Sequence, residues 1–490
     1  MSSQFSQESP FIIQVKVLLA KVHTKSIVKD SLVERASFFY ENQQVIQHIK
    51  DNFNEELSQL NAELDKKTIK DKKFIKNKIV RVKKEQTEYL EKLSIERNER
   101  NQYLLSICQE ILALCEGESF GESNRKSAKL LGAIQLLSPT EGKSIAIANE
   151  QNKPIYKAVL ALRLLDCLCM DKKVTGPYIK KYMGTISSAD YVDFAQISAD
   201  EYKLFVSQVK IPVIMAAILQ DIGNYHFDAQ KIICGDNGDK DPHRMLEVDE
   251  RKKLLQINYR ETLTYLIEGI GLPKYIGNSK ADRNKFNEQE RNKLLFIKQL
   301  LKSSINPKES VGNLLKVPQI YTSIILSIKD NYNYKLLPKV YNALNQNAER
   351  GNCSQFAVDA LRKVTGDFPQ GFGVIYIPKD SSGRPYERYE YAIVNALYPK
   401  KANEPICRST TRNLAFISYG ADFVVKEDSN LYFPGVVKQL TRMSKDRLHE
   451  ILELLSSNYN ERKQLDLVPR CWHTQEFFSL KKNQNICNKS

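Results

Sequence analysis

The chain has 490 residues, of which 42% are hydrophobic, and its 73 Lys and Arg outnumber its 58 Asp and Glu to give a formal net charge of +15. This length and apolar content are enough for sizeable cores and predict two to four structural units. The apolar runs are far shorter than the roughly 20 residues needed to span a bilayer, and Arg163 and Asp166 interrupt one of them. We therefore expect no transmembrane segment.

The start of the chain and its cysteines indicate a compartment. The first ten residues are polar and lack the basic start and apolar core of a secretory signal. Nine cysteines are scattered along the chain, and the close pair Cys167 and Cys169 does not have the spacing of a zinc knuckle. Reduced thiols explain such a pattern best. The expected location is cytoplasmic.

The first quarter of the chain has the composition of long helices, because residues 11–116 contain neither Gly nor Pro. We expect an N-terminal helical segment over residues 1–40. Residues 41–116 are charged and periodic. They predict an antiparallel hairpin that turns in its lysine-rich centre, or one coiled-coil arm that dimerises. Either arrangement offers a surface for a protein partner or for self-association.

A strongly basic run lies within this segment. Residues 66–84 contain ten Lys and Arg, and Phe74 is the only aromatic residue among them. No recognised nucleic-acid module accompanies the run, which argues against a nucleic-acid partner. It predicts either a solvated helix face or a contact with an anionic surface.

The remaining sequence is helical first and then rich in β-strand patterns. Helical periodicity predicts a helical domain over residues 117–366. The runs GVIYIP and YEYAIVNALYP, joined across Asp380–Gly383, predict a small β unit over residues 367–435. A last helix from Val436 to Ser456 and a polar tail are expected within residues 436–490. The predicted fold class is mainly α with a small C-terminal β unit.

The tract IPVIMAAILQDIGNYH, from Ile211 to His226, resembles the metal-site helix of the HD superfamily of phosphohydrolases and of the HD-GYP cyclic-dinucleotide phosphodiesterases within it. In that family the helix runs through small apolar residues to His-Asp and then to Ile-Gly-Lys. Here Gln220 and Asp221 stand at the His-Asp pair, and Asn224 stands at the Lys. The resemblance covers residues 156–425 and implies an HD-like helical bundle in a bacterial protein of cyclic-di-GMP signalling.

The departures from the family pattern concern the metal site. The family chemistry needs His and Asp because both bind a divalent cation that activates water for attack on phosphorus. Gln220 offers only a neutral carbonyl oxygen, and Asn258 stands where the HD-GYP pattern has a further metal-binding His. The six histidines of the chain are too few and too dispersed for a dinuclear site. Gln220, Asp221 and His226 are therefore predicted to be vestiges of a catalytic site, and no cofactor is expected.

Two alternatives to a vestigial site remain open. Asp221, His226 and Asp228 could hold a single divalent metal, which is expected only if the chain is an active phosphohydrolase. The tract also fits an ordinary buried helix with one apolar stripe from Ile214 to Asp221, ended by Gly223 and the residue after it.

A second candidate site lies in the β-rich part. Arg408 and Arg412 match the RxxxR half of the PilZ motif, which binds cyclic-di-GMP, and two arginines on a loop could clamp a phosphate. Solvated arginines are the alternative.

The favoured function is a non-catalytic regulatory or signalling protein that acts through protein–protein contacts, with nucleotide binding as an additional expectation. The alternatives are a metal-dependent phosphohydrolase or cyclic-di-GMP phosphodiesterase, and a structural adaptor.

Overall fold

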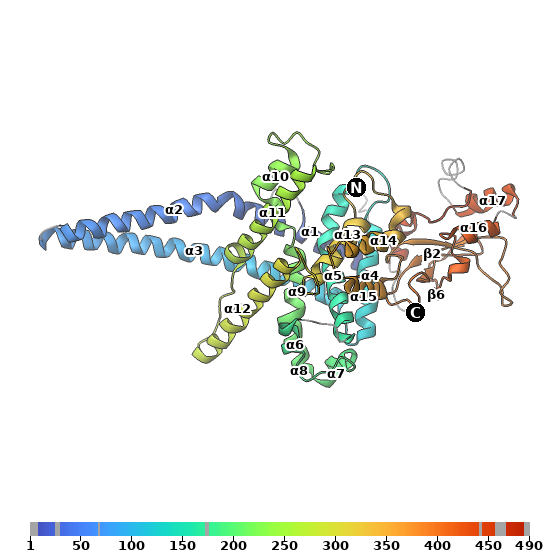
Figure 1. Cartoon of the computed structure of the whole chain (residues 1–490), viewed down its shortest axis with the longest axis horizontal. Helices are drawn as coiled ribbons and strands as arrows, with labels where there is room; N and C mark the ends of the chain where they lie inside the picture. The colour runs from blue at the N-terminus through green and yellow to red at the C-terminus, as the bar shows by residue number, and fades with distance from the viewer. Residues whose placement is uncertain are drawn as a thin grey trace, which may run out of the picture. The chain divides into compact units, whose positions relative to one another are not determined.

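The computed structural model describes residues 8–24, 30–66, 69–171, 176–440, 443–455 and 467–484, without the side chains of residues 66–71. The described chain is mainly α-helical with a small antiparallel sheet towards the C-terminus, which confirms the predicted fold class (Figure 1). It divides into two compact units, both discontinuous in sequence. Unit 1 comprises residues 1–20, 108–218 and 299–490, and unit 2 comprises residues 21–107 and 219–298. The boundary after Ile218 therefore falls inside the tract that resembles the HD family.

Helix α5 (Ile145–Met170) is the central helix of unit 1. Every residue from Ile155 to Cys169 is buried, as expected for a helix that is apolar nearly all round. Helices α4 (Phe120–Leu137), α13 (Asn313–Ile325) and α15 (Gln355–Thr365) pack against it. The other α-helices that lie wholly or mostly in the described part of unit 1 are α1 (Pro10–Val22), α6 (Pro177–Met183), α7 (Phe194–Ile197), α8 (Ala199–Phe205), α9 (Ile211–Leu219), α14 (Val340–Glu349), α16 (Pro434–Leu440), α17 (Lys445–Leu455) and α19 (Gln475–Ser479).

The sheet of unit 1 has four antiparallel strands in the order β1-β2-β3-β6. Its strands are β1 (Gly373–Tyr376), β2 (Glu390–Val394), β3 (Ile406–Ser409) and β6 (Asp422–Val424), and β4 (Thr411–Arg412) pairs with β5 (Ala415–Phe416). The β1–β2 hairpin turns where the sequence predicts, because the Gly383 N–H donates to Asp380 O and Gly383 has a positive φ of 81°.

The C-terminal segment forms part of the core of the sheet. The Trp472 ring stacks on the Tyr391 ring with centroids 4.7 Å apart, and its Nε1 donates to Ala392 O. Phe477 and Phe478 are buried in the same cluster. Residues 467–484 are thus packed, although the sequence predicted a polar tail. Where one helix was expected over residues 436–456, the structure has α16 and α17, and the Ser444 hydroxyl caps the second.

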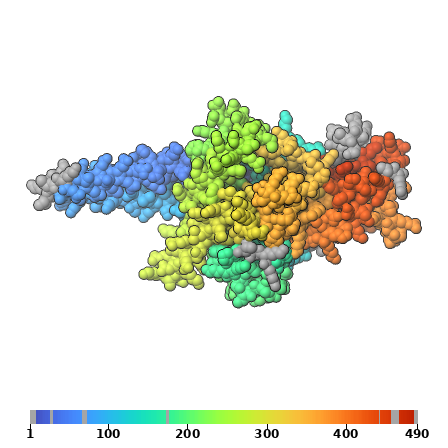
Figure 2. All heavy atoms as spheres, in the orientation of Figure 1, coloured from blue at the N-terminus to red at the C-terminus, as the bar shows by residue number. Residues whose placement is uncertain are grey.

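Unit 2 contains an antiparallel hairpin of two long helices, α2 (Leu32–Lys66) and α3 (Ile69–Cys115), which run side by side (Figures 1 and 2). The last part of α3, from Cys108, belongs to unit 1. Of the two predicted arrangements for residues 41–116, the structure has the hairpin, and residues 67–68 between its helices lie outside the described residues. An apolar seam joins the helices and includes Leu60, Ile75, Ile79 and Val82. These α3 positions recur at intervals of four and three residues, as one face of a helix requires.

The rest of unit 2 packs against the hairpin near the ends of its helices. It contains the 3-10 helix η3 (Ile222–Tyr225), α10 (Phe227–Cys234), α11 (Val248–Thr264), the π-helix η4 (Tyr265–Ile270) and the first part of α12 (Lys280–Ser303). On α3, Arg97 donates to Ile267 O and Arg100 donates to Gly269 O, both at 2.7 Å. Cations are favourable at a helix C-terminus, where carbonyl groups lack partners. These contacts fasten α3 to the end of η4.

Among the described residues, one helical stretch, Ala199–Tyr225, is long and apolar enough to cross a membrane by length and composition. Its apolar window is 72% buried inside the protein. It is also divided into α8, the π-helix η2 (Val206–Lys210), α9 and η3 rather than forming one regular helix. Burial within the fold accounts for its composition.

Candidate functional site

The tract that resembles the HD family ends its helix early. Helix α9 stops at Leu219, so Gln220 and Asp221 lie in a turn before η3. The alternative of an ordinary buried helix predicted that the helix continues through both residues and is ended by Gly223 and Asn224. Ile214 and Ile218, predicted to face a core, are buried.

A close approach between η3 and α11 explains why the chain turns there. The Gly223 N–H donates to Thr262 Oγ1 at 3.1 Å, and Asn258 Nδ2 donates to Gln220 O at 3.1 Å. A Cβ on Gly223 would lie 2.2 Å from Asn258 O. Asn258, for which the resemblance predicted a metal-ligand position, therefore holds the turn through its side chain. The Oε1 atom of Gln220 is buried and has no hydrogen-bond partner among the described groups.

His226 begins α10 as a helix cap. Its Nδ1 accepts the Asp228 backbone N–H at 3.2 Å, and its Nε2 lies 3.9 Å from Glu261 Oε2. The Tyr40 ring of α2 packs edge-on against the imidazole with centroids 5.2 Å apart. Burial lowers the pKa of His226 and outweighs the opposite effect of the Glu261 and Asp228 carboxylates. An accepting Nδ1 requires the neutral ring with its proton on Nε2.

The predicted single-metal ligands do not form a metal-binding group. Among the described residues, no three His, Cys, Asp or Glu side chains are placed to hold a metal ion. The Asp228 carboxylate lies 3.9 Å from the Arg260 guanidinium, and His226 Nδ1 already accepts a backbone N–H. The geometry gives His226 and Asp228 the role of starting a helix.

The His226 cap predicts a pH dependence. Its pKa is lowered in the folded state, so the stability it contributes is complete above about 6.5, the usual value for His, and is lost as the pH falls below it. Protonation removes the Nδ1 acceptor, and the loss of a helix cap costs about 1 kcal/mol. We expect the melting temperature of wild type, measured between pH 8 and pH 5, to fall more than that of His226→Asn, since Asn caps without titrating.

His48 provides the matched control, because it is exposed on α2 of the same unit. His48→Asn is expected to keep the wild-type pH profile. A His226→Asn profile that parallels the wild type would contradict the cap.

Arg408 and Arg412, which have the spacing of the PilZ motif, lie on different pairs of strands. Arg408 on β3 donates to Asp422 Oδ1 on β6 at 2.6 Å, and this oxygen also accepts from Asn395. Arg412 is exposed on β4, opposite Ala415. A phosphate at Arg408 would therefore compete with a carboxylate that is already bound.

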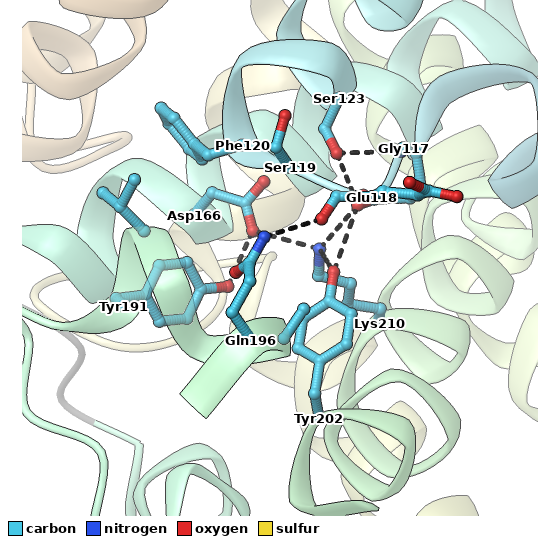
Figure 3. Close-up of a pocket in the computed structure, with 13 residues that line it drawn as sticks. Gly117, Glu118, Ser119, Phe120, Ser123, Asp166, Tyr191, Gln196, Tyr202 and Lys210 are labelled. Carbon is cyan, nitrogen blue, oxygen red and sulfur yellow. Dashed lines mark hydrogen bonds and ion pairs between the residues drawn. The ribbon is translucent and has the colours of Figure 1, made fainter. Parts of the chain in front are cut away.

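A cluster of buried charges, which no sequence motif predicted, lies in unit 1, and Figure 3 labels two of its members, Asp166 and Lys210. Arg163 and Asp166 come from α5, Glu116 follows α3, and Lys210 ends η2. Arg163 contacts both carboxylates, at 2.8 Å from Asp166 Oδ2. Lys210 Nζ lies 2.9 Å from Glu116 Oε2 and 3.4 Å from Asp166 Oδ1. The two cations and two carboxylates balance, as buried charges require.

Hydroxyl groups complete the cluster. The Tyr191 hydroxyl donates to Asp166 Oδ1 at 2.7 Å, and the Tyr202 hydroxyl lies 3.1 Å from Lys210 Nζ. The Ser123 hydroxyl, at the start of α4, lies 3.3 Å from Glu116 Oε2. The cluster thereby ties together the residue after α3, helices α4, α5 and α8, the 3-10 helix η1 (Tyr191–Asp193) and η2, and it is a polar centre within an otherwise apolar core.

The electrostatics of the cluster favour permanent charge. Burial raises the pKa of Glu116, but Arg163 and Lys210 outweigh it and lower the pKa to about 2. The pKa of Lys210 is raised, because the attraction of Asp166 and Glu116 exceeds the effect of burial. A general acid or base works best with a pKa near the working pH. These groups instead stay charged near neutrality.

The cleft beside the cluster is small. It is lined by residues 117–120, by Gln196 and by the cluster side chains other than Arg163, and its free volume is about 20 Å³. That is room for about one water molecule. The arrangement therefore fits an ion network that holds helices in place. The sequence signal for it is the pair Arg163 and Asp166, three residues apart within an apolar run.

No family model, no curated protein and no solved structure matches this chain. The relation to the HD and HD-GYP families therefore remains a prediction from the residues of the tract from Ile211 to His226.

Proposed function

We propose that the protein is a non-catalytic regulatory protein of the cytoplasm, built on a degenerate HD-GYP-like domain and acting through contacts of the α2/α3 hairpin. The observation that carries the proposal is the use of His226 and Asn258, at or near family metal positions, as hydrogen-bonding groups of the backbone. A side chain that caps a helix serves the fold. Such a domain can keep its packing while its chemistry is lost.

The way the hairpin is attached supports its role as the contact element. Tyr40 on α2 donates to Glu261 O at 3.0 Å and packs against His226, and Arg97 and Arg100 on α3 bind the carbonyl groups that end η4. A partner that binds the hairpin would thus act on helices in direct contact with the His226 cap. Nucleotide binding through Arg408 and Arg412 is a subsidiary part of the proposal, and it requires a phosphate to displace Asp422 from Arg408.

The proposal predicts that the purified protein does not hydrolyse cyclic-di-GMP. Incubation with the dinucleotide and Mn²⁺ or Fe²⁺ is expected to give no linear product above the level of heat-denatured protein. The physical reason is that Gln220 and Asn258 supply no imidazole for metal activation of water. Turnover by wild type that disappears in Asp221→Ala would refute the proposal.

A further inference from the structure

The outer face of α3 combines cations with exposed apolar side chains. The seam of the hairpin buries Ile75, Ile79 and Val82 of this helix. Positions 73, 77, 80 and 84 follow the same spacing on the opposite side of the helix. There Val80 is 67% exposed and the neighbouring Phe74 is 74% exposed. No residue of the hairpin covers them in the described part of the chain.

The charges around these two side chains have one sign. From Lys72 to Lys84, α3 carries seven Lys and Arg and no Asp or Glu. Among these cations, Lys78 lies 3.9 Å from Glu56 of α2, and Arg81 and Lys84 lie 3.7 and 3.8 Å from acids one turn further along α3. Such exposed pairs are weak and screened by salt. The face therefore presents a positive field around two apolar side chains.

We propose that this face of α3, residues 72–84, binds the surface of an anionic lipid bilayer. The inference rests on the proposed function, in which the hairpin is the contact element, and names its partner. Anionic headgroups attract lysines near a membrane surface, and exposed Phe and aliphatic side chains enter the boundary between headgroups and acyl chains. Lysine stems extend along apolar surface while their charges stay in water. A nucleic acid would use the cations but has no place for Val80.

The same helix contains a region that lacks this combination. Ile95 is 60% exposed and lies about three helical turns beyond position 84 on the same outer face, where Glu88 and Glu91 are its neighbours. Like charge opposes approach to an anionic surface. We therefore expect the binding face to end near Glu85, where the first acid follows the basic run.

The test is cosedimentation of the full chain with large vesicles of phosphatidylcholine, with or without phosphatidylglycerol. We expect binding to vesicles that contain phosphatidylglycerol and a steep loss of binding between 50 and 300 mM NaCl, because the screening length shortens from roughly 14 to 6 Å. Lys73→Gln and Lys84→Gln are each expected to weaken binding about fivefold. Phe74→Ser and Val80→Ser are expected to weaken it several-fold while keeping its salt dependence.

Ile95→Ser and Lys92→Gln are the matched controls on the same helix, and both are expected to bind as wild type does. Unchanged helix content of every variant by circular dichroism would show that folding is intact. Equal binding to neutral vesicles, or binding that the four variants of the face leave unchanged, would overturn the inference. Tighter binding to a DNA or RNA duplex through the same residues would also overturn it. Hydrolysis of cyclic-di-GMP would contradict the proposed function but not this result.

Discussion

Glu116→Gln is expected to destabilise unit 1 by about 3–5 kcal/mol, because it leaves the buried charges of Arg163 and Lys210 with one carboxylate fewer. Glu116 contacts both cations, and Arg163 is fully buried. Trp472, the single Trp of the chain, lies in the core of the same unit. Its fluorescence during urea unfolding therefore reports on the unit that holds the cluster.

Two further variants test whether the loss of stability depends on the burial of the charge that is removed. Lys203 on α8 pairs with Asp200 at 3.5 Å, but both side chains are largely exposed. Lys203→Gln is expected to change stability by less than about 0.5 kcal/mol. Adding Lys210→Met to Glu116→Gln restores neutrality, so the double variant is expected to lose about 1–3 kcal/mol less than the sum of the single losses. If Glu116→Gln lowers the free energy of unfolding as little as Lys203→Gln does, the cluster contributes little stability.

The lowered pKa of Glu116 gives the same cluster a pH signature. A carboxylate whose pKa falls to about 2 on folding contributes stability that is complete above its ordinary value of 4.5. This contribution is lost as the pH falls from 4.5 towards 2. Glu116→Gln is therefore expected to lose less stability than wild type between pH 4.5 and pH 2, as measured from unfolding curves followed by Trp472 fluorescence.

Local patterns allowed the hairpin and the sheet to be predicted. The absence of Gly and Pro over residues 11–116 and the apolar spacing of α3 are properties of neighbouring residues, and so is the turn at Asp380–Gly383. Each of these signals acts within a few residues, where propensity and turn chemistry decide the structure. The polar tail was predicted from composition alone. The prediction was wrong because Trp472 is buried against β2.

The buried cluster depends on charged residues that pair although they are far apart in the sequence. A single sequence gives no local pattern from which such pairs can be predicted. Glu116 lies 47 residues from Arg163 and 94 residues from Lys210. From the sequence, only the spacing of Arg163 and Asp166 on α5 was visible, and it served solely to exclude a membrane span. The end of α9 is a similar case. Its turn depends on Asn258, which lies 38 residues after Gln220.

The glycine of the HD-like tract is expected to be required for packing. Gly223→Ala should destabilise unit 2 by about 3 kcal/mol, near the upper end for an added methyl group in a packed site. The new Cβ would lie 2.2 Å from Asn258 O and 2.9 Å from its Cα. Both are backbone atoms inside α11, so neither can rotate away. Separation of η3 from α11 would also lengthen the hydrogen bond from Gly223 to Thr262.

Hydrogen–deuterium exchange over residues 222–264 measures this loss where it occurs. Gly121→Ala is the matched control, because Gly121 lies in α4 and a Cβ added there would meet no atom within 4 Å. This control is expected to stabilise its helix by up to about 1 kcal/mol. The faster exchange of Gly223→Ala should be the same with and without EDTA, since a steric clash does not depend on metal. If Gly223→Ala exchanges as slowly as wild type, the packing role is refuted. If its exchange is faster than that of wild type only without EDTA, Gly223 belongs to a metal site.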